Sequence, residues 1–435
     1  MIGFAGLSPL GIVTSIASAS KGFEVVAYDP NTSLCDEINA GRLPVYEPDL
    51  DDLLNKNRSN IRFSAGIEEL AECRLIVFSS DIKTDEENRS DLSILETLID
   101  DVVKVVSDDT VLVVLSQVHP GFTRQLFQKL KPELQRKNAR LFYQVETLIF
   151  GRAVERALYP ERYIVGCKDP SEPLPAVYRE VLDSFACPIL PMKYESAELA
   201  KISINCYLVA SVSTANTLAE ISEKIGADWS EIVPALRLDK RIGQYAYLEP
   251  GLGIAGGNLE RDLMTIMGLS KEFGTDASVV EAWIANSAYR KDWVFRKLHE
   301  VVLSKYDDPI LAVWGLAYKI NTKSVKNSPS LVLLKNLKGI KVKAYDPQAT
   351  IDLFSFPGVS QVSTPMDACK GAKALIVMTP WSEFKSIDPA EIKRYLDGYV
   401  IIDPYKSLNA QQCEKIGLKY LTLGRPMEIP NDRSS

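Results

Sequence analysis

The first 29 residues constrain the fold of this chain more than any other stretch. An apolar run at residues 1–5 leads into the turn Gly6-Leu7-Ser8-Pro9-Leu10-Gly11, and an apolar helical segment follows to about residue 21. A second apolar run, residues 24–28, ends at Asp29. This order of strand, glycine-rich turn, helix, strand and acidic residue is typical of the dinucleotide-binding unit. In that unit, amides at the helix N-terminus hold pyrophosphate and the carboxylate accepts ribose hydroxyls.

Ser8 is the imperfect position of this motif. It stands where the second glycine is expected, so a side chain is predicted near the phosphates. Serine is the smallest such intrusion, and an acidic residue at position 29 favours NAD over NADP. The sequence therefore predicts an NAD site that includes Gly6, Ser8, Leu10, Gly11 and Asp29. A purely structural turn is the alternative.

Apolar runs continue to alternate with helix-like segments over the first 190 residues. Four of them stand at residues 75–78, 111–115, 140–143 and 163–165. This alternation predicts a parallel sheet with helices on both faces, and ligands bind beyond the carboxyl ends of such strands. Polar turns follow two of these strands, so we add Ser79, Ser116 and Gln117 to the cofactor candidates. Polar turns after strands are also common without any function.

From Tyr194 the sequence predicts a long helix. Apolar residues recur at spacings of three and four between residues 199 and 212, which is typical of an amphipathic helix. Glu198, Lys201 and Asn205 share a neighbouring face, where they either hold a water or hydroxyl or are simply solvated. Residues 263–269 and 279–298 also have helical patterns, so the middle of the chain is predicted to be an α-helical layer suited to dimerisation.

A second α/β region begins at residue 309. Its apolar runs stand at residues 310–314, 342–346, 374–378 and 399–402, and Asp346 is placed like Asp29. It lacks the glycine motif, so it is predicted to bind something other than the dinucleotide, or nothing. The fold class is therefore α/β, with two Rossmann-like doubly wound parallel-sheet domains joined by a central α-helical dimerisation domain. The predicted domains are residues 1–190, 191–302 and 303–424, with a polar tail at 425–435.

We expect the chain to be organised around a glycine-rich loop at residues 250–257, Pro-Gly-Leu-Gly-Ile-Ala-Gly-Gly. Its small and flexible residues let a backbone approach a ligand closely. Asn258, Arg261 and Asp262 follow directly and supply polar chemistry. A plain surface turn before a helix is an equally good interpretation of the loop alone.

The composition excludes several classes of protein. The net charge of −7 and the pI near 5.3 argue against a nucleic-acid or membrane partner. Seven scattered cysteines without a CxxC pair indicate reduced thiols in the cytoplasm, and two histidines make a metal cluster or a His-based triad improbable. There is no apolar run of about 18 residues and no basic start of a signal peptide.

These motifs, in their order and spacing, resemble the UDP-glucose/GDP-mannose dehydrogenase family of nucleotide-sugar dehydrogenases from about residue 1 to residue 403. The motifs that carry the resemblance are residues 6–11 with Asp29, Pro44-Val45-Tyr46-Glu47-Pro48, 116–123, 195–201, Asn205, 226–229, 239–243, the glycine loop ending in Asp262, Gly315-Leu316-Ala317-Tyr318-Lys319, Asn321-Thr322, Ser328-Pro329 and Ala344-Tyr345-Asp346-Pro347.

The resemblance implies an N-terminal NAD domain, a helical dimer-forming centre and a C-terminal domain that holds the nucleotide sugar. Family members oxidise the sugar C6 alcohol to a carboxylate in two NAD-dependent steps, the second through a covalent thiohemiacetal on a cysteine. Carried over by position, Lys201, Asn205 and Asp262 arrange the water and alkoxide, with Glu146 as an acid/base candidate. The implied substrate-binding residues are Thr147, Leu148, Lys201, Asn205, Arg241 (reaching across the dimer), Tyr247, Gly251, Gly253, Tyr318 and Lys319. Lys326, at the place of a family arginine, is a further cofactor candidate.

The departures from the family pattern cluster around one chemical step and the edge of the cofactor site. Asn258 stands at the position of the nucleophilic cysteine, and an amide cannot form a thioester. Gln117 replaces a threonine, Phe150 a glutamate, residues 80–82 a Gly-Thr-Pro turn, and residues 323–326 an Asp-Asp-x-Arg run. Cys206, next to Asn205, is off the helix stripe of Lys201 and is a poor substitute nucleophile.

Three functions remain open from the sequence. The leading hypothesis is an NAD-dependent oxidoreductase that acts on a nucleotide-linked sugar, most simply a UDP-sugar, and stops at the carbonyl stage or runs in the reducing direction. A four-electron dehydrogenase that uses a hydrated aldehyde in place of a thioester is the alternative among enzymes. The third is a catalytically silent nucleotide-sugar-binding protein. A homodimer or higher homo-oligomer is expected in each case.

Overall fold

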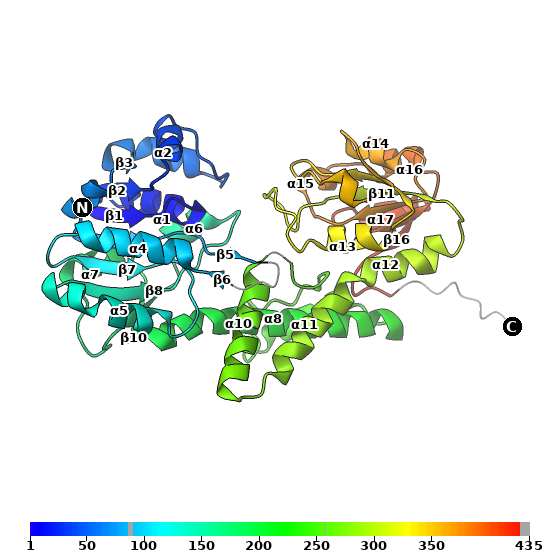
Figure 1. The fold of residues 1–435 in the computed structure, drawn as a ribbon. Helices are drawn as coiled ribbons and strands as arrows, with labels where there is room; N and C mark the ends of the chain where they lie inside the picture. Colours follow the sequence, from blue (N-terminus) through cyan, green and yellow to red (C-terminus); the bar gives the residue numbers. More distant parts are fainter. Residues whose placement is uncertain (86–89, 256, 427–435) are drawn as a thin grey trace. The chain divides into compact units, whose positions relative to one another are not determined.

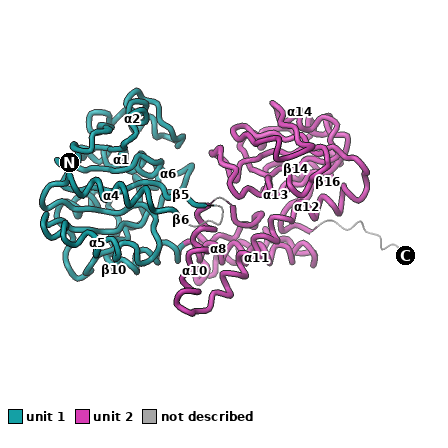
Figure 2. The backbone as a smooth tube through the Cα atoms, viewed as in Figure 1, with its two compact units in different colours: residues 1–204 teal, residues 205–435 magenta. Residues whose placement is uncertain are grey.

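The computed structural model describes residues 1–85, 90–255 and 257–426, and the chain divides into two compact units, residues 1–204 and residues 205–435 (Figure 2). Each unit contains one large sheet, and the fold class is the predicted one. The predicted domain boundaries stay predictions. Residues 427–435 of the predicted tail, and Gly256 of the glycine loop, lie outside the described residues.

The first sheet has the strand order β10-β9-β8-β7-β4-β1-β2-β3 (Figure 1). The strands from β3 to β8 are parallel to their neighbours, but β9 pairs with β8 in the antiparallel direction and β10 runs parallel to β9. The prediction of a parallel sheet therefore holds up to β8, and the last two strands are reversed. The strands are β1 (Ile2–Ala5), β2 (Val25–Tyr28), β3 (Ile61–Ser64), β4 (Leu75–Phe78), β7 (Val111–Val114), β8 (Arg140–Gln144), β9 (Tyr163–Cys167) and β10 (Ile189–Lys193). The short strands β5 (Lys83–Thr84) and β6 (Ser90–Asp91) form a separate antiparallel pair.

Helices cover both faces of this sheet, as predicted. Successive side chains of a strand point to opposite faces, so Ile2 and Phe4 join the core beneath α1, α3, α6 and α7, while Ala5 joins the core beneath α4 and α5. The two faces are therefore buried separately, which is the doubly wound arrangement. The helices are α1 (Pro9–Ser20), α2 (Thr32–Asn39), α3 (Leu50–Lys56), α4 (Ser93–Val105), α5 (Phe122–Arg136), α6 (Ala153–Leu158) and α7 (Ala176–Asp183).

The long helix predicted from Tyr194 is α8 (Tyr194–Ile225), and the boundary between the two units falls within it. It is followed by α9 (Trp229–Leu238), α10 (Asn258–Phe273), α11 (Ser278–Lys291) and α12 (Trp293–Leu298). The Asp228 carboxylate caps α9 by accepting the Ser230 amide, and Gly274, at φ +67°, ends α10 in the left-handed conformation that favours glycine. These local signals set the helix limits in the central segment.

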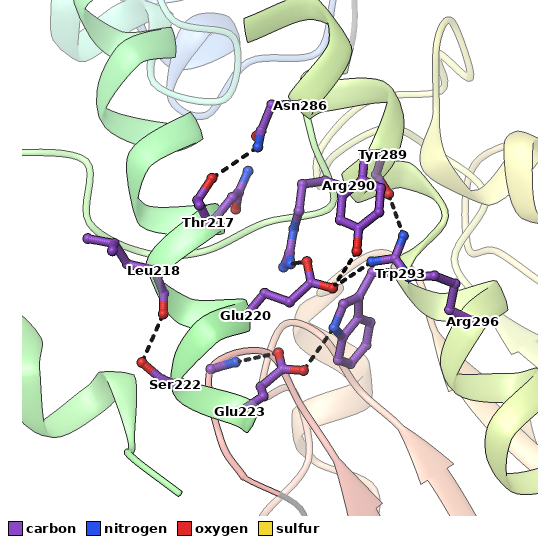
Figure 3. Close-up of polar contacts among 12 residues, drawn as sticks. Thr217, Leu218, Glu220, Ser222, Glu223, Asn286, Tyr289, Arg290, Trp293 and Arg296 are labelled. Carbon is purple, nitrogen blue, oxygen red and sulfur yellow. Dashed lines mark hydrogen bonds and ion pairs between the residues drawn. The ribbon is translucent and has the colours of Figure 1, made fainter. Parts of the chain in front are cut away.

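Two carboxylates of α8 fasten the helices of the second unit to one another (Figure 3). Glu220 accepts hydrogen bonds from Arg290 at 2.5 Å, from Arg296 at 2.8 Å and from the Tyr289 hydroxyl at 3.1 Å. Burial raises the pKa of Glu220, but the charges of Arg290 and Arg296 and the hydrogen bonds from Arg290 and Tyr289 together outweigh it, so the pKa lies below its usual value. Glu223 accepts from the Trp293 indole at 3.1 Å and from the Gly424 amide at 3.0 Å, and so ties α8 to α12 and to the turn after residue 421.

The second sheet, in the order β13-β12-β11-β14-β15-β16, is parallel throughout. Its strands are β11 (Ile310–Trp314), β12 (Lys341–Tyr345), β13 (Val359–Gln361), β14 (Ala374–Val377), β15 (Val400–Ile402) and β16 (Lys419–Leu421). Its helices are α13 (Pro329–Asn336), α14 (Pro365–Cys369), α15 (Ser382–Lys385), α16 (Pro389–Tyr395) and α17 (Ala410–Lys415). Over the described ranges, none of the helices combines the length and apolar character that crossing a membrane requires.

Candidate functional site

The turn after β1 is built around two glycines that leave no room for a side chain. Gly6 has φ +96°, and a Cβ on it would lie 2.3 Å from the Ser80 hydroxyl oxygen. A Cβ on Gly11 would lie 2.0 Å from the Gly6 carbonyl oxygen. The Ser79 hydroxyl donates to that same carbonyl at 2.9 Å and fixes the turn against the end of β4. The close approach of backbone segments that the glycine motif predicts is therefore present.

The Ser8 side chain is held away from the helix N-terminus by a hydrogen bond. Its hydroxyl donates to the Ser79 carbonyl at 2.7 Å and makes no cap on the amides of α1, which begins at Pro9. The structure thus gives the hydroxyl a protein partner at the end of β4. The sequence predicts that the Ser8 side chain obstructs the phosphate region. Because the hydroxyl is bound to the Ser79 carbonyl, this obstruction is smaller than that of a free side chain.

Asp29 lines a pocket of about 360 Å³. Its carboxylate accepts the Leu7 amide at 2.8 Å and the Asn31 amide at 3.0 Å, and the residue is half-buried. A carboxylate has about four acceptor positions, so it retains capacity for ribose hydroxyls. The pocket is lined by Gly6, Tyr28, Asp29, Pro30, Ser80, Ser93, Ile94, Thr97, Leu98 and Asp101. These residues fit the adenosine side of NAD.

The α4 side of this pocket was not predicted. Ser93, Thr97 and Asp101 are spaced four residues apart and all line it, because such residues share one face of a helix. That polar stripe was the available signal. Burial, followed by the charge of Asp101, raises the pKa of the Tyr28 hydroxyl, which keeps it neutral beside the pocket.

The remaining cofactor candidates of the first unit lie near these turns in different roles. Ser116 is fully buried and its hydroxyl donates to the Ser80 carbonyl at 2.6 Å. The Leu10 side chain belongs to the hydrophobic core, so only its backbone is placed to face a ligand. Gln117 follows Ser116 and is half-buried. Their contacts with the cofactor stay predictions.

Lys201 and Glu146 meet within the first unit. The Lys201 ammonium donates to the Glu146 carbonyl at 2.9 Å and to its carboxylate at 3.3 Å. The Glu146 carboxylate also accepts the Leu148 amide, so the segment from Glu146 to Leu148, which includes Thr147, is locally ordered. An amine and a carboxylate in contact provide a proton donor and acceptor at one place.

Glu47 supports this segment and was not identified as a site residue. It is almost fully buried and accepts the amides of Gly151 at 2.8 Å and Ala153 at 3.1 Å. It thereby caps the turn that leads from Glu146 into α6. Its motif, residues 44–48, carries part of the family resemblance, but the sequence alone assigns Glu47 no role.

Glu198 is not part of a solvated stripe. It is fully buried and accepts the amides of Gly121 at 2.6 Å and Thr123 at 2.7 Å at the start of α5. Burial raises the pKa of this carboxyl above its usual value. The solvated interpretation is therefore wrong for Glu198, which joins α8 to the start of α5.

Asn205 and Asp262 form a buried pair in the second unit. The Asn205 amide donates to the Asp262 carboxylate at 2.5 Å, and Arg261 lies 3.4 Å from the other oxygen. All three side chains are more than nine-tenths buried. Because Lys201 and Asn205 are four residues apart on α8, they share one face of the helix. The catalytic roles of these residues stay predictions.

The glycine loop before α10 packs against two helices of the second unit. The Gly251 amide donates to the Asn216 side chain at 2.7 Å, and a Cβ on Gly253, at φ +82°, would lie 2.5 Å from the Ser287 carbonyl oxygen. Asn258 is exposed and is the first residue of α10. The loop is thus anchored by its backbone, which is more than a plain surface turn requires.

Cys206 is a poor nucleophile in this structure. It packs beside Val209 and Leu263 in a small apolar cluster. Burial and then the charge of Asp262 raise the pKa of its thiol, which disfavours the reactive thiolate. This agrees with the expectation that Cys206 does not replace the family's cysteine.

The other substrate and cofactor candidates of the second unit are spread over its loops. Arg241 is highly exposed and pairs with Asp239 at 2.6 Å, while Tyr247 is half-exposed. The Lys319 ammonium lies 5.6 Å from the centre of the Tyr318 ring. A Cβ on Gly257 would lie 3.7 Å from the Lys326 side chain, so Lys326 flanks the start of α10. Among the residues described, no group of three or more His, Cys, Asp or Glu could hold a metal ion.

Comparisons with known proteins cover nearly the whole chain. Models of the UDP-glucose/GDP-mannose dehydrogenase family match residues 1–186 (NAD binding domain), 195–288 (central domain) and 312–410 (UDP binding domain). A UDP-glucose 6-dehydrogenase of Rickettsia bellii is 28% identical over 433 residues, 97% of this chain and 99% of its own length.

Two solved structures have the same fold. A UDP-D-ManNAc dehydrogenase from Pyrococcus horikoshii has a TM-score of 0.84 at 22% identity, covering 98% of this chain and 99% of its own. A UDP-glucose dehydrogenase from the archaeon Pyrobaculum islandicum has a TM-score of 0.81 at 24% identity, covering 97% and 96%. At these identities the likeness supports the fold alone.

Proposed function

The chain belongs to the UDP-glucose/GDP-mannose dehydrogenase family and is an NAD-dependent oxidoreductase acting on CH–OH groups, and from this premise we propose that it oxidises a UDP-linked sugar only to the carbonyl stage. The reaction converts a sugar alcohol and NAD⁺ into the sugar carbonyl, NADH and a proton. The proposal is supported by the hydrogen-bonded pair of Asn205 and Asp262, by Lys201 in the motif that resembles the family's, and by an asparagine, Asn258, where the resemblance implies a cysteine.

The residues of the chain perform the proton and charge chemistry, and NAD, when bound, accepts the hydride. The Lys201 ammonium is oriented by its hydrogen bonds to Glu146 and can stabilise the alkoxide that develops on the sugar oxygen. The Glu146 carboxylate can accept the proton of the sugar alcohol. The Asp262 carboxylate fixes the amide of Asn205, which leaves the Asn205 oxygen to bind a hydroxyl proton. These groups suffice for one hydride transfer.

A UDP-sugar is the proposed substrate because the second Rossmann-like region matches the family's UDP binding domain. The Rickettsia bellii relative is named for UDP-glucose. We propose that Thr147, Leu148, Arg241, Tyr247, Gly251, Gly253, Tyr318 and Lys319 hold this substrate. Lys326 is proposed for the cofactor.

We propose that Asn258 stands at the position of the family's cysteine, as the motif resemblance implies, and that the second oxidation is therefore lost. An amide is not a nucleophile towards an aldehyde, and the raised pKa of Cys206 leaves that thiol protonated. Two other functions follow if this is wrong. A four-electron dehydrogenase would pass through a hydrated aldehyde, and a silent nucleotide-sugar-binding protein would not turn over.

Stoichiometry tests the proposal directly. With UDP-glucose and related UDP-sugars, we expect one NADH for each sugar consumed and an aldehyde product that an aldehyde-trapping reagent captures. Two NADH for each sugar, with a uronic acid as product, would support the four-electron alternative. No NADH, together with sugar binding measured by calorimetry, would support the silent binder.

Two substitutions, each with a control substitution, assign the roles. Asn258→Cys should raise the number of NADH formed for each sugar consumed from one towards two. Asn258→Ser should leave this number at one, because serine is similar in size to cysteine but has no thiol. Lys201→Ala should lower kcat about 100-fold, the usual size of a lost acid–base group. Lys224→Ala, an exposed lysine on the same helix, should leave kcat unchanged. Full turnover by Lys201→Ala would contradict the catalytic assignment.

We also propose a homodimer, or a higher homo-oligomer, in the cytoplasm. Exposed large apolar side chains occur on two of the central helices, Tyr207, Leu218, Ile221 and Ile225 on α8 and Ile284 and Tyr289 on α11. Their number on two helices that a hydrogen bond from Asn286 to Thr217 joins supports an interaction site there. The seven cysteines are all free, which suits a reducing compartment. Light scattering of the purified chain measures the oligomeric state.

A further inference from the structure

The pocket at Asp29 has a second carboxylate in its wall, that of Asp101 on α4. None of the described residues that line this pocket is a lysine or an arginine. Asp29 is the predicted acceptor for the ribose hydroxyls of NAD, and the base is joined to that ribose. The base is therefore expected to fill the α4 side of the pocket, where Asp101 lies.

Two exposed apolar side chains can hold the flat faces of a base in this pocket. Pro30 follows Asp29 directly and is exposed, and Ile94 on α4 is 51% exposed. Leu98, one turn after Ile94, also lines the pocket and is almost fully buried in the core beneath α4. The pocket thus offers accessible apolar surface, and its volume of about 360 Å³ is in the ordinary range for ligand pockets.

The polar stripe of α4 presents hydrogen-bond acceptors to the pocket. The Ser93 hydroxyl donates to the Asp91 carboxylate at 2.7 Å, and the Thr97 hydroxyl donates to the Ser93 carbonyl at 2.8 Å. The single proton of each hydroxyl is therefore in use, and only oxygen lone pairs remain. One oxygen of Asp101 accepts from Lys104 at 2.9 Å in an exposed ion pair, which leaves acceptor positions of this carboxylate available. A wall of this kind favours a ligand that presents a donor.

We propose that Asp101 selects the adenine base of NAD by accepting a hydrogen bond from its exocyclic 6-amino group. The amino group is a donor, and a hydrogen bond to a charged acceptor is stronger than one between neutral groups. A base with a carbonyl oxygen at this position, such as hypoxanthine, would place an acceptor against the carboxylate. The inference concerns the cofactor alone, so it is independent of the sugar that is oxidised and of the number of electrons transferred.

Titration with two reduced cofactors tests the proposal on the full chain, with the fluorescence of the reduced nicotinamide as the signal. NADH is compared with reduced nicotinamide hypoxanthine dinucleotide, in which a carbonyl replaces the 6-amino group. We expect NADH to bind at least about fivefold more tightly. Asp101→Asn should reduce this ratio of Kd values to less than about twofold, because an amide can present either its oxygen or its NH₂ group to the base.

Asp100→Asn is the matched control. It removes the same charge from the same helix, but Asp100 pairs with Lys129 at 2.7 Å and does not line the pocket, so the ratio should stay at its original value. Lys104→Met removes the ion-pair partner of Asp101 but keeps the carboxylate, so it should also preserve the ratio.

Four results would overturn the proposal. They are equal affinities of the original chain for the two cofactors, an unchanged ratio in Asp101→Asn, an equal fall of the ratio in either control variant, and loss of all cofactor binding in Asp101→Asn. The last would mean that Asp101 supports the pocket as a whole. Because its side chain is 52% exposed, we expect Asp101→Asn to leave the first unit folded.

Discussion

The two Rossmann-like regions are built on the same turn and use it differently. In the first, the order β3-β2-β1-β4-β7-β8 corresponds strand for strand to β13-β12-β11-β14-β15-β16 in the second. Gly6 follows β1 at φ +96°, and Gly315 follows β11 at φ +95°. Each glycine amide donates to the last residue of the neighbouring strand, at 2.9 Å to Tyr28 and at 2.7 Å to Tyr345. The two turns therefore share the positive φ of the glycine and the hydrogen bond of its amide.

The acidic residue after the second strand separates the two regions. Asp29 accepts two backbone amides and is half-buried at a pocket. Asp346 is almost fully buried and accepts five donors, the amides of residues 316, 317, 348 and 349 and the indole of Trp381. A carboxylate so occupied cannot accept ribose hydroxyls. The same residue type thus keeps acceptor capacity at a pocket in one region and is fully used by the fold in the other.

The start of the following helix shows the same division. In the first region α1 begins at Pro9, directly after the turn, so its free amides stand near the glycine. In the second region α13 begins only at Pro329, and the Ser328 side chain caps it by accepting the Ser330 amide. In the second region, therefore, the turn is not followed directly by free helix amides, and the carboxylate has no free acceptor position. Both are features of a dinucleotide site.

The largest effect that tests this comparison is expected from Asp346→Ala. It leaves four backbone amides and an indole without their acceptor, and should cost the second unit about 4 kcal/mol of its free energy of unfolding. All five tryptophans, residues 229, 283, 293, 314 and 381, lie in that unit, so urea unfolding followed by tryptophan fluorescence measures it selectively. Asp29→Ala is the matched variant and should leave this transition unchanged. Equal effects of the two changes would contradict the division of roles.

The next effect is expected from alanine at the two glycines. A Cβ on Gly315 would lie 2.5 Å from the Thr379 backbone nitrogen, whereas on Gly6 the nearest atom is the Ser80 hydroxyl oxygen, which can move. Gly315→Ala should therefore destabilise the second unit by about 3 kcal/mol, the strain of positive φ included. Gly6→Ala should leave the tryptophan transition unchanged and weaken NADH binding. If Gly315→Ala weakened NADH binding instead, the two turns would not be functionally distinct.

The sequence predicted this fold where local signals are strong. The glycine turn, Asp29 and the apolar runs define most strands, and the spacing on α8 joined Lys201 to Asn205. The reversed direction of β9 was not predictable, because an apolar run carries no sign of strand direction. Glu198 was misjudged because its acceptor role depends on amides of residues 121 and 123, which only tertiary packing brings to it.

A smaller effect is expected on cofactor affinity at Asp29 itself. Asp29→Ala removes the acceptor for the ribose hydroxyls and should raise the Kd for NADH about tenfold, or about 1.4 kcal/mol. Fluorescence titration with NADH measures it, and the affinity for UDP should not change. The Asp29 carboxylate should repel the additional phosphate of NADPH. Asp29→Ala removes this repulsion, so the difference between the Kd values for NADH and NADPH should become smaller. An unchanged NADH affinity would mean that Asp29 only holds the turn, as Asp346 does.

The smallest effect is expected from Ser8→Gly, which restores the glycine of the motif. The sequence alone suggests that the serine obstructs the phosphates, so its removal would strengthen binding. In the structure the hydroxyl is held by the Ser79 carbonyl at 2.7 Å, away from the amides of α1. We therefore expect the Kd for NADH to change by less than about threefold, a difference below about 0.7 kcal/mol. A tenfold gain in affinity would show that the side chain turns towards the phosphates when NAD binds, and that the first turn, too, is partly closed to its ligand.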